Sequence, residues 1–274
     1  MPELPDLEVI AEFLNRHLAG ARIEEASVLK PIVVRNLTGD DFASRLAGQR
    51  VASVTRRGKF LLFELGAGDW LVINPMRAGR LRYQASADKV AGKPFVVLRF
   101  AEGKTLCYLD PATMGKVYLT SALERVPAFA ALGPDALDPA LTLGVFAERL
   151  RRRRGEIKGT LVSQTFVAGI GNAYADEILF RAGVYPFRKR ASLSEHEVRR
   201  IYEAMHAVLR QAMDVLRERV GAEIHIEIRD FLQVHGRGEQ ACPRCGTPIS
   251  RITARGRLTN FCRKCQPGTM LGKR

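Results

Sequence analysis

Two closely spaced cysteine pairs near the C-terminus constrain the fold of this chain more than any other feature of its sequence. Cys242 and Cys245 form one C-x-x-C pair, and Cys262 and Cys265 form a second pair after sixteen intervening residues. This spacing is typical of a structural site in which four thiolates surround one tetrahedral zinc ion. Two matched pairs make a redox motif or chance clustering a weaker interpretation. The sequence therefore predicts one structural zinc ion that folds a hairpin too small for a core of its own.

The charge of the chain narrows the class of partner. The 274 residues include 43 Lys and Arg against 29 Asp and Glu, which gives a net charge of +14. Such an excess is typical of nucleic-acid binding, although DNA, RNA and ribosomal partners fit it equally. No segment has the apolar length of a membrane span, and the acidic first residues do not fit a signal peptide. We therefore expect a cytoplasmic protein without a membrane partner, in which cysteines stay reduced.

Short apolar runs separated by turn residues fill the first half of the chain. Apolar residues recur at helical spacing between Leu7 and Leu18, and Gly20 follows as a helix end. Seven runs with strand character come next, at residues 21–29, 50–65, 69–75, 79–84, 94–100, 105–110 and 116–120. Strands this short and frequent predict a β-sandwich or barrel up to about Thr120. Cys107 falls within one of these runs and is expected in the core.

Helical spacing dominates the second half. A proline-rich segment at residues 127–140 predicts a linker, and helical runs follow at residues 142–154, 156–166, 172–183 and 192–220. The expected fold class is α+β, with an N-terminal domain at residues 1–126, the linker, a helical domain at residues 141–235, and a zinc-finger hairpin with a tail at residues 236–274.

A glycine-rich turn precedes the helical run at residues 172–183. Gly169 and Gly171 permit a tight turn, and backbone N–H groups at the following helix start favour a phosphate. Lys158 and Asn172 flank this turn, so both are candidates to reach one backbone phosphate. The same turn would also form if it only let two helices pack closely, and similar turns occur in helix–hairpin–helix DNA modules.

Further basic residues occur near these motifs. Arg251, Arg255 and Arg257 lie between the cysteine pairs, where cations suit a phosphate or base contact. A merely solvated basic loop is the competing interpretation. The four arginines at residues 151–154 are most simply a solvated helix face, and we assign them no specific role.

The first five residues, Met-Pro-Glu-Leu-Pro, make an unusually rigid chain end. If Met1 is removed, Pro2 presents a secondary amine, and α-amino groups have a pKa of about 7.7–8.0. Part of such an amine is unprotonated at neutral pH and can attack an electrophilic carbon, with Glu3 as a candidate acid–base partner. The alternative is a helix-start device that combines proline with acidic residues in the first turn.

Four motifs occur in one order along the chain. They are MPELPDLE at residues 1–8, RRGKFLLFEL at residues 56–65, the segment at residues 157–186, and QVHGRG at residues 233–238 with the four-cysteine tail. Together they resemble the formamidopyrimidine-DNA glycosylase/endonuclease VIII family of base-excision repair. The resemblance implies an N-terminal β-sandwich domain, a helix–two-turn–helix domain and a zinc finger. It also implies double-stranded DNA with a damaged base or abasic site as the partner, bound in a cleft between domains by a protein that we expect to be monomeric.

The resemblance also implies roles for individual residues. Pro2 matches the nucleophile, Glu3 the acid–base carboxylate, and Lys59 a lysine that contacts a phosphate beside the lesion. The nucleotide is flipped out of the stack, and the Pro2 amine attacks C1′. Departure of the base leaves a Schiff base, and phosphate elimination then nicks the strand. Lys158 and Asn172 match residues that hold the DNA backbone, and Arg257 matches the arginine at the tip of the zinc hairpin.

Several residues depart from the family pattern. Asp6 stands where the family usually has glutamate. Arg77 takes the place of a space-filling methionine, and Met76 lies one position earlier. Thr113 replaces an arginine that reads the opposite base, and Met114 replaces a phenylalanine inserted into the stack. An apolar wedge is therefore expected to remain, whereas the usual reader of the opposite base is not.

We expect a bifunctional DNA glycosylase and abasic-site lyase for formamidopyrimidines, 8-oxoguanine or oxidised pyrimidines. One alternative is a non-catalytic zinc-finger protein that binds damaged or abasic DNA, and another is a basic zinc-ribbon protein of the ribosome or transcription machinery. Pro2, Glu3 and Lys59 favour the enzyme, because a binder needs no freed amine beside a carboxylate. The short segment between Val220 and Cys242 leaves little chain to cap a flipped base, which predicts broad lesion choice and weak dependence on the opposite base.

Overall fold

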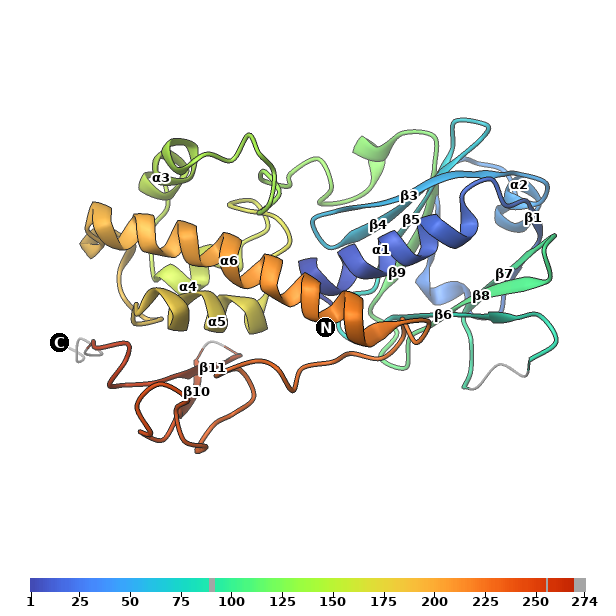
Figure 1. The fold of residues 1–274 in the computed structure, drawn as a ribbon. Coiled ribbons are helices and arrows are strands. Elements are labelled where there is room, and N and C mark those ends of the chain that lie inside the picture. The colour runs from blue at the N-terminus through green and yellow to red at the C-terminus, as the bar shows by residue number, and fades with distance from the viewer. Residues whose placement is uncertain (89–91, 255, 269–274) are drawn as a thin grey trace. The chain divides into compact units, whose positions relative to one another are not determined.

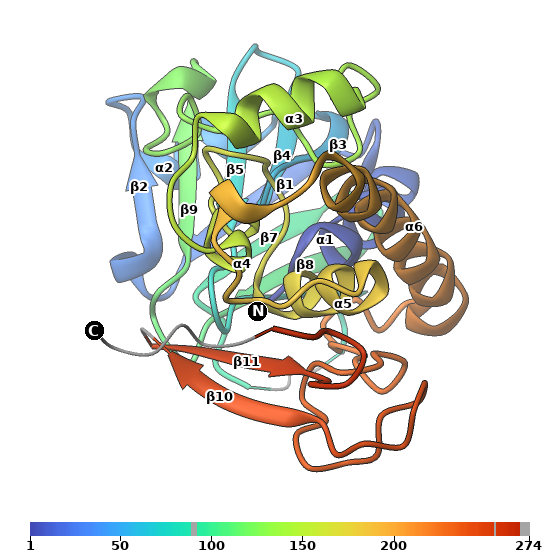
Figure 2. The same ribbon diagram turned by 90° about the vertical axis from the view of Figure 1, so that its left-hand side faces the viewer.

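The computed structural model describes residues 1–88, 92–254 and 256–268, which form two compact units (Figure 1 and Figure 2). Unit 1 consists of Met1–Ala131 and Met213–Ile228, and unit 2 of Leu132–Ala212 and the described part of Arg229–Arg274. The long helix α6 (Glu195–Val220) contributes to both units. Arg255 and the last six residues of the expected tail lie outside the described residues.

Unit 1 contains two β-sheets that pack face to face. One sheet has the order β1-β7-β8-β6 and the other β2-β9-β5-β4-β3. The strands are β1 (Ile23–Val28), β2 (Val34–Asn36), β3 (Val51–Arg57), β4 (Phe60–Leu65), β5 (Trp70–Asn74), β6 (Arg80–Ala85), β7 (Val96–Phe100), β8 (Lys104–Leu109) and β9 (Lys116–Thr120). Ile73 and Val117 of one sheet face Leu106 of the other across the interior. The predicted sandwich is confirmed.

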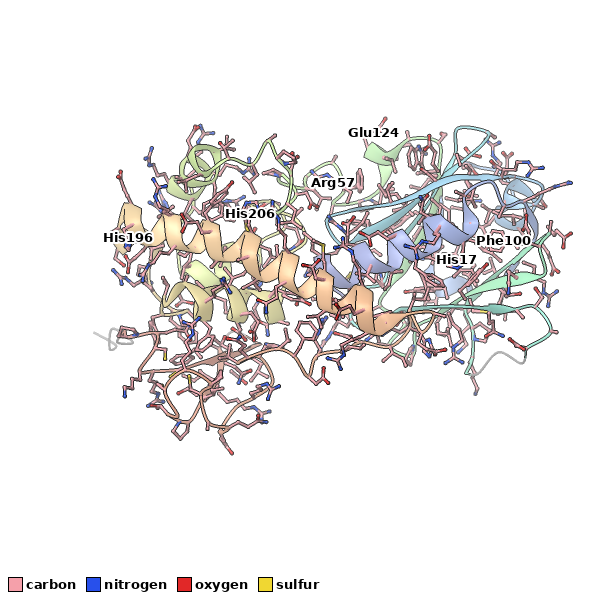
Figure 3. The ribbon with its side chains drawn as sticks, in the orientation of Figure 1. His17, Arg57, Phe100, Glu124, His196 and His206 are labelled. Atoms are coloured by element: carbon pink, nitrogen blue, oxygen red, sulfur yellow. The ribbon has the colours of Figure 1, made fainter. Side chains whose placement is uncertain are left out.

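The core lies between these sheets, and burial is almost continuous along β4, β8 and β9. Phe63 on β4 is fully buried, and Phe100 on β7 (Figure 3) is 1% exposed. Cys107 is also fully buried, as expected, and burial raises the pKa of its thiol. The predicted run at residues 50–65 forms two strands, because Gly58 adopts a positive φ of 59° and turns the chain between them. Among the described helices, none is long and apolar enough to span a bilayer.

The first helix, α1 (Leu4–Leu18), begins three residues before the predicted apolar spacing. Asp6 closes half of a capping box, because its carboxylate accepts a hydrogen bond from the Glu3 backbone N–H at 2.8 Å. Leu4, Leu7 and Leu14 are fully buried, so this helix fixes the N-terminus to the core. The Glu12 carboxylate on α1 binds Arg217 of α6 at 2.7 Å.

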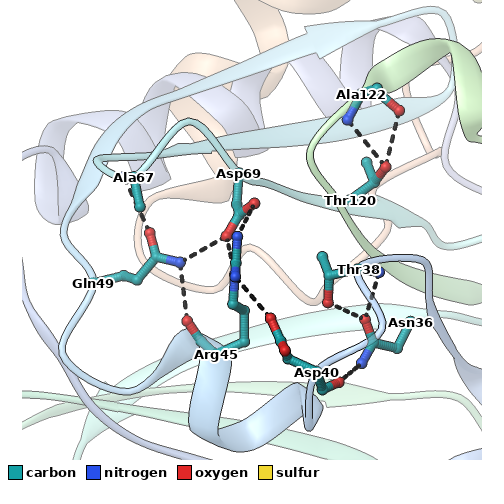
Figure 4. A network of polar contacts seen from close by, with 9 residues as sticks. All are labelled: Asn36, Thr38, Asp40, Arg45, Gln49, Ala67, Asp69, Thr120 and Ala122. Carbon is teal, nitrogen blue, oxygen red and sulfur yellow. Dashed lines mark hydrogen bonds and ion pairs between the residues drawn. The ribbon is translucent and has the colours of Figure 1, made fainter.

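A polar network joins the short helix α2 (Phe42–Leu46) to the turn before β5 (Figure 4). The Asp69 side chain is 1% exposed and accepts hydrogen bonds from Arg45 Nε at 2.7 Å and from Gln49 Nε2 at 3.0 Å. The hydrogen bond from Arg45 lowers the pKa of Asp69. Neither α2 nor β2 was predicted, because such short elements carry no measurable periodicity. The remaining short helices of unit 1 are η1 (Pro31–Val33) and η2 (Leu123–Arg125).

Unit 2 combines helices with one hairpin. Its elements are α3 (Leu143–Arg151), α4 (Ile157–Leu161), α5 (Asn172–Ala182), η3 (Arg190–Ser192), the first part of α6, β10 (Ser250–Ala254) and β11 (Arg257–Phe261). Helix α4 is shorter than the predicted run at residues 156–166, because Gln164 instead supports the following turn. Its side chain donates to the carbonyls of Val162 and Ile170 and accepts from the Gly169 N–H.

Residues 127–140 contain neither helix nor strand, but they are not a free tether. Ala136 is fully buried and its N–H donates to Ala168 O at 3.1 Å. A Cβ at Gly133 would lie 2.5 Å from Phe166 O, so only glycine fits there. The second half of the expected linker is thus packed into unit 2.

Candidate functional site

The N-terminal residues are held in place within unit 1. Pro2 is buried, and Glu3, 2% exposed, precedes the first turn of α1. The Met1 amino group lies 3.1 Å from a carboxylate oxygen of Glu227. The helix-start interpretation is therefore correct for the local structure. It is compatible with a chemical role, because the same contacts fix Pro2 and Glu3.

Lys59 lies in the tight turn between β3 and β4. Arg57, labelled in Figure 3, pairs with Phe60 on either side of this turn. The Arg56 guanidinium contacts the Glu8 carboxylate at 2.6 Å and thereby joins β3 to α1. The turn that carries Lys59 is thus fixed to the helix that begins at Pro2 and Glu3.

Two neighbouring loops of unit 1 carry the four residues expected to fill the stack or to face the opposite base. Met76 and Arg77 lie between β5 and β6, and Thr113 and Met114 lie between β8 and β9. The strand ends that carry both loops are paired, Asn74 with Lys116 and Arg80 with Leu109. The structure therefore brings these four residues to one end of the sandwich.

Both loops have features typical of a binding site. Met76 and Thr113 adopt positive φ angles of 49° and 56°, a conformation that side chains other than glycine rarely adopt. The side chains of Met76 and Met114 are 37% and 40% exposed. Two exposed methionines next to strained residues present an apolar tip that the packing of unit 1 does not require.

The buried side chains of Tyr108 and Asp110 support the two loops from the interior of unit 1. Asp110 is fully buried and accepts the Gly115 N–H at 2.6 Å. A Cβ at Gly79 or Gly115 would lie 2.4 or 1.8 Å from the Tyr108 hydroxyl, so both loops need glycine. Burial, and next the Asp110 charge, raise the pKa of Tyr108. Sequence reasoning missed these two supports. The glycine that closes each loop was the available signal.

Lys158 and Asn172 lie together in unit 2 and hold the zinc hairpin. The Lys158 side chain is 6% exposed, and its ammonium group lies 2.7 Å from Asp176 Oδ1. It donates to Leu258 O at 2.8 Å, and Asn172 Nδ2 donates to the same carbonyl at 2.6 Å. Lys158 was expected to reach a DNA phosphate. In this structure its ammonium group contacts Asp176 and the Leu258 carbonyl, and its contact with DNA stays a prediction.

Arg257 is placed by these contacts. It is exposed at the tip of the β10–β11 hairpin, opposite Ala254 and next to Leu258. Because Lys158 and Asn172 both bind the Leu258 carbonyl, they fix the strand that presents the Arg257 guanidinium. The two residues therefore act on this cation through the backbone.

Asp176 and Glu177, which sequence reasoning did not single out, connect α5 to the approach of the hairpin. Glu177, 6% exposed, accepts backbone N–H groups of residues 233, 234 and 235 at 2.8–2.9 Å. Burial raises the pKa of Glu177. Asp176, fully buried, accepts the Asn260 N–H at 3.1 Å and contacts His235 Nδ1 at 2.8 Å. These two carboxylates collect donors that a loop would otherwise leave unpaired.

The four cysteines form the predicted metal site. Their sulfur atoms all lie within 4.8 Å of one another, with Cys242–Cys265 at 3.8 Å and Cys245–Cys262 at 3.5 Å. Zn–S bonds of about 2.3 Å in a tetrahedron separate sulfurs by about 3.8 Å, so the site fits zinc. The site packs against Phe180 of α5, over which Arg244 lies at 4.2 Å.

Replacing Lys158 by methionine is expected to destabilise unit 2 by about 3–5 kcal/mol, because the buried Asp176 carboxylate would lose its ammonium partner and keep only His235 and the Asn260 N–H. Amide hydrogen exchange in α5 and β11 measures this change. The same substitution at the exposed Lys189 is the control and should leave exchange unchanged. If Lys158→Met lowered DNA affinity without faster exchange, Lys158 would contact DNA directly.

Three family models match successive parts of the chain. Residues 1–117 match the N-terminal domain model of formamidopyrimidine-DNA glycosylase. Residues 132–223 match the H2TH domain model of the same enzyme. Residues 239–268 match a zinc finger found in FPG and IleRS.

Individual relatives are similar over almost their full length. The formamidopyrimidine-DNA glycosylases of Geobacillus kaustophilus and Desulfitobacterium hafniense are 37% and 38% identical, and each match covers 97% of this chain and 100% of the relative. The MutM (FPG) structure from Thermus thermophilus is 32% identical, with a TM-score of 0.84 over 97% of this chain and 98% of that one. A Lactococcus lactis FPG bound to DNA that contains FAPY-dG has a TM-score of 0.88 at 29% identity and covers 97% of this chain and all of that one. This chain therefore belongs to the formamidopyrimidine-DNA glycosylase family, the DNA glycosylases and abasic-site lyases of base-excision repair.

Proposed function

We propose that this DNA glycosylase and lyase uses the secondary amine of Pro2 as its nucleophile once Met1 has been removed. The observation that carries the proposal is the N-terminal segment itself, in which Pro2 is buried and Glu3 is fixed at the start of α1. A frayed chain end could not hold an amine against one carbon atom of a sugar. The ordered segment supports the enzyme over a non-catalytic DNA-binding protein.

The proposed reaction has two stages. The Pro2 nitrogen attacks C1′ of the flipped nucleotide, the C1′–N bond to the base breaks, and Glu3 assists the proton transfers that release the base. Opening of the sugar ring then gives an iminium ion between Pro2 and C1′. This cation acidifies the C2′ proton, and loss of that proton expels the phosphate on C3′ and nicks the strand. Four cysteine ligands would fill the tetrahedral coordination of zinc and leave no open position for these steps.

The proposed partner is double-stranded DNA that contains a damaged base or an abasic site. The net charge of +14 supports a polyanion. We assign phosphate contacts to Lys59, Asn172 and Arg257, and assign Met76 and Met114 to the space left by the flipped nucleotide. The protein is proposed to act as a monomer in the cytoplasm, with the DNA. The proposed domains are residues 1–126, 141–235 and 236–274, joined by residues 127–140.

We further propose broad lesion choice, covering ring-opened purines and oxidised pyrimidines. The segment after α6 is short and is tied to β6 by contacts of His225 with Arg82 and of Glu227 with Arg80. A segment held in this way has little freedom to close over a flipped base. It therefore makes few contacts with the edges of that base and discriminates weakly among lesions. Thr113 offers a methyl and a hydroxyl group where an arginine would donate two hydrogen bonds, so preference for the opposite base should be modest.

Single-turnover rates on a panel of duplexes test this proposal. We expect an 8-oxoguanine duplex with each of the four opposite bases to differ by less than about tenfold, and a thymine-glycol duplex to be cut at a comparable rate. Borohydride trapping on the same duplexes reports the covalent intermediate. A sharp preference for 8-oxoguanine opposite cytosine would contradict broad choice. Binding without cutting or trapping on any duplex would favour the non-catalytic alternative.

A further inference from the structure

A second carboxylate, besides Glu3, lies against the N-terminus. The Met1 amino nitrogen lies 3.1 Å from Glu227 Oε1 and 3.2 Å from Glu227 Oε2. Glu227 is 226 residues away in sequence and belongs to the segment that follows α6. The contact joins the two sequence segments of unit 1 at the chain end that carries the proposed nucleophile.

Glu227 is held in a defined position. Its carboxylate also pairs with Arg80, the first residue of β6, and its side chain is 20% exposed. Two residues away, His225 Nε2 contacts Arg82 Nη2 at 2.7 Å. Because Arg80 and Arg82 alternate along β6 as Glu227 and His225 alternate along the segment, the two contacts fix one register between them. The carboxylate therefore faces the N-terminus in a fixed arrangement.

Removal of Met1 moves the amino group to Pro2. One residue separates the two nitrogens, and they are at most about 4 Å apart by standard bond lengths. An amino group on Pro2 therefore stays within electrostatic range of Glu227.

We propose that Glu227, held by Arg80, positions the N-terminal amine of the processed chain and sets the pH at which that amine becomes nucleophilic. The inference rests on the proposed role of Pro2. Glu227 acts through the amine and is thus a positioning residue. In the unprocessed chain, the Met1 amino group binds the same Glu227 carboxylate.

The sign of the effect follows from the charges around the amine. Glu227 faces it from the segment after α6, and Arg80 of β6 pairs with Glu227. Glu3 and Asp6 are its nearest acidic neighbours in sequence, at the start of α1. His225, Glu223 and Arg82 are one step further away. A carboxylate beside an ammonium ion favours the charged form, whereas a guanidinium opposes it. Burial, and next Arg82, lower the pKa of His225, so it is neutral where an α-amino group titrates.

The test uses chains without Met1 and a duplex with one abasic site at saturating enzyme. Schiff-base formation is followed across pH by quenching aliquots with borohydride. Glu227→Gln should lower the midpoint of the pH–rate profile by about half a unit, which is about threefold faster trapping below the midpoint. Arg80→Gln should shift the midpoint upward, because the guanidinium that opposes protonation of the amine is lost while the Glu227 carboxylate remains. Glu223→Gln, in the same segment with a 66% exposed side chain, is the control and should match the wild type.

The outcomes separate this inference from the role of Pro2. If the wild type forms no trapped complex, the proposed nucleophile is wrong. If the wild type is trapped but Glu227→Gln keeps the wild-type midpoint, the nucleophile stands and the role of Glu227 is overturned. A loss of rate at every pH without a change of midpoint would show that Glu227 only maintains the fold.

Discussion

Blocking the Pro2 amine is expected to abolish covalent trapping on abasic DNA. A chain that carries two additional residues, Gly-Ser, before Pro2 converts the secondary amine into an amide, whose nitrogen lone pair is delocalised and cannot attack C1′. Borohydride should then give no cross-linked species, whereas the chain that begins at Pro2 should give one whose mass maps to that residue. The two chains differ only ahead of the helix that starts at Leu4, so both should fold.

Glu3→Gln separates the two stages of the reaction. We expect release of a damaged base to fall by about 10²–10⁴-fold, the usual contribution of a positioned acid or base. Nicking of a ready-made abasic site should fall less, because no base has to leave. Glu24→Gln, at an exposed glutamate of β1, is the matched control and should affect neither stage strongly. Equal loss in both stages would contradict the role assigned to Glu3. In the preceding experiment, a cross-linked species from the chain that carries Gly-Ser before Pro2 would show that Pro2 is not the nucleophile.

Much of the fold could be predicted because its signals are local. The buried apolar runs of β4 and β5 and the helical spacing in α5 and α6 follow from neighbouring residues alone. The position of Gly183, with a left-handed φ of 66° at the end of α5, follows from the lack of a Cβ. Zinc ligation was predicted for the same reason, since C-x-x-C fixes two thiolates by local geometry.

The partners of charged residues could not be predicted, because they depend on three-dimensional packing. Lys158 looks like a free cation in the sequence, yet folding places Asp176 at 2.7 Å from its ammonium group. Glu227 lies 226 residues from Met1 and has no motif. A basic residue near a DNA-binding motif can contact the nucleic acid or support the element that does, and only the burial of its charged group distinguishes these roles.

Removal of zinc is expected to unfold the hairpin while the β-sandwich of unit 1 stays folded. Structural zinc contributes about 10–16 kcal/mol of binding free energy to small domains. The apolar cluster around the site is small and consists of Phe180, Val234 and Ile249 with the cysteines themselves, so it cannot replace the metal as a core. Cys245→Ser should therefore abolish stoichiometric zinc and expose the amides of residues 239–268 to rapid hydrogen exchange. Cys107→Ala is the control, because Cys107 is fully buried in unit 1 and its loss should leave zinc content unchanged.

The consequence for DNA binding depends on how the hairpin is attached. Leu258 and Asn260 of β11 are held by Lys158, Asn172 and Asp176. These contacts need β11 to keep its extended backbone, which pairing with β10 and the zinc site maintain. Without zinc, Arg257 loses its fixed position and Lys158 and Asp176 lose their hairpin partners, so affinity for abasic DNA should fall further than in Arg257→Ala. Equal affinities of the Cys245→Ser and Arg257→Ala chains would show that zinc serves only to present this one guanidinium. Slow exchange in β11 after removal of zinc would show that α4 and α5 hold the hairpin without the metal.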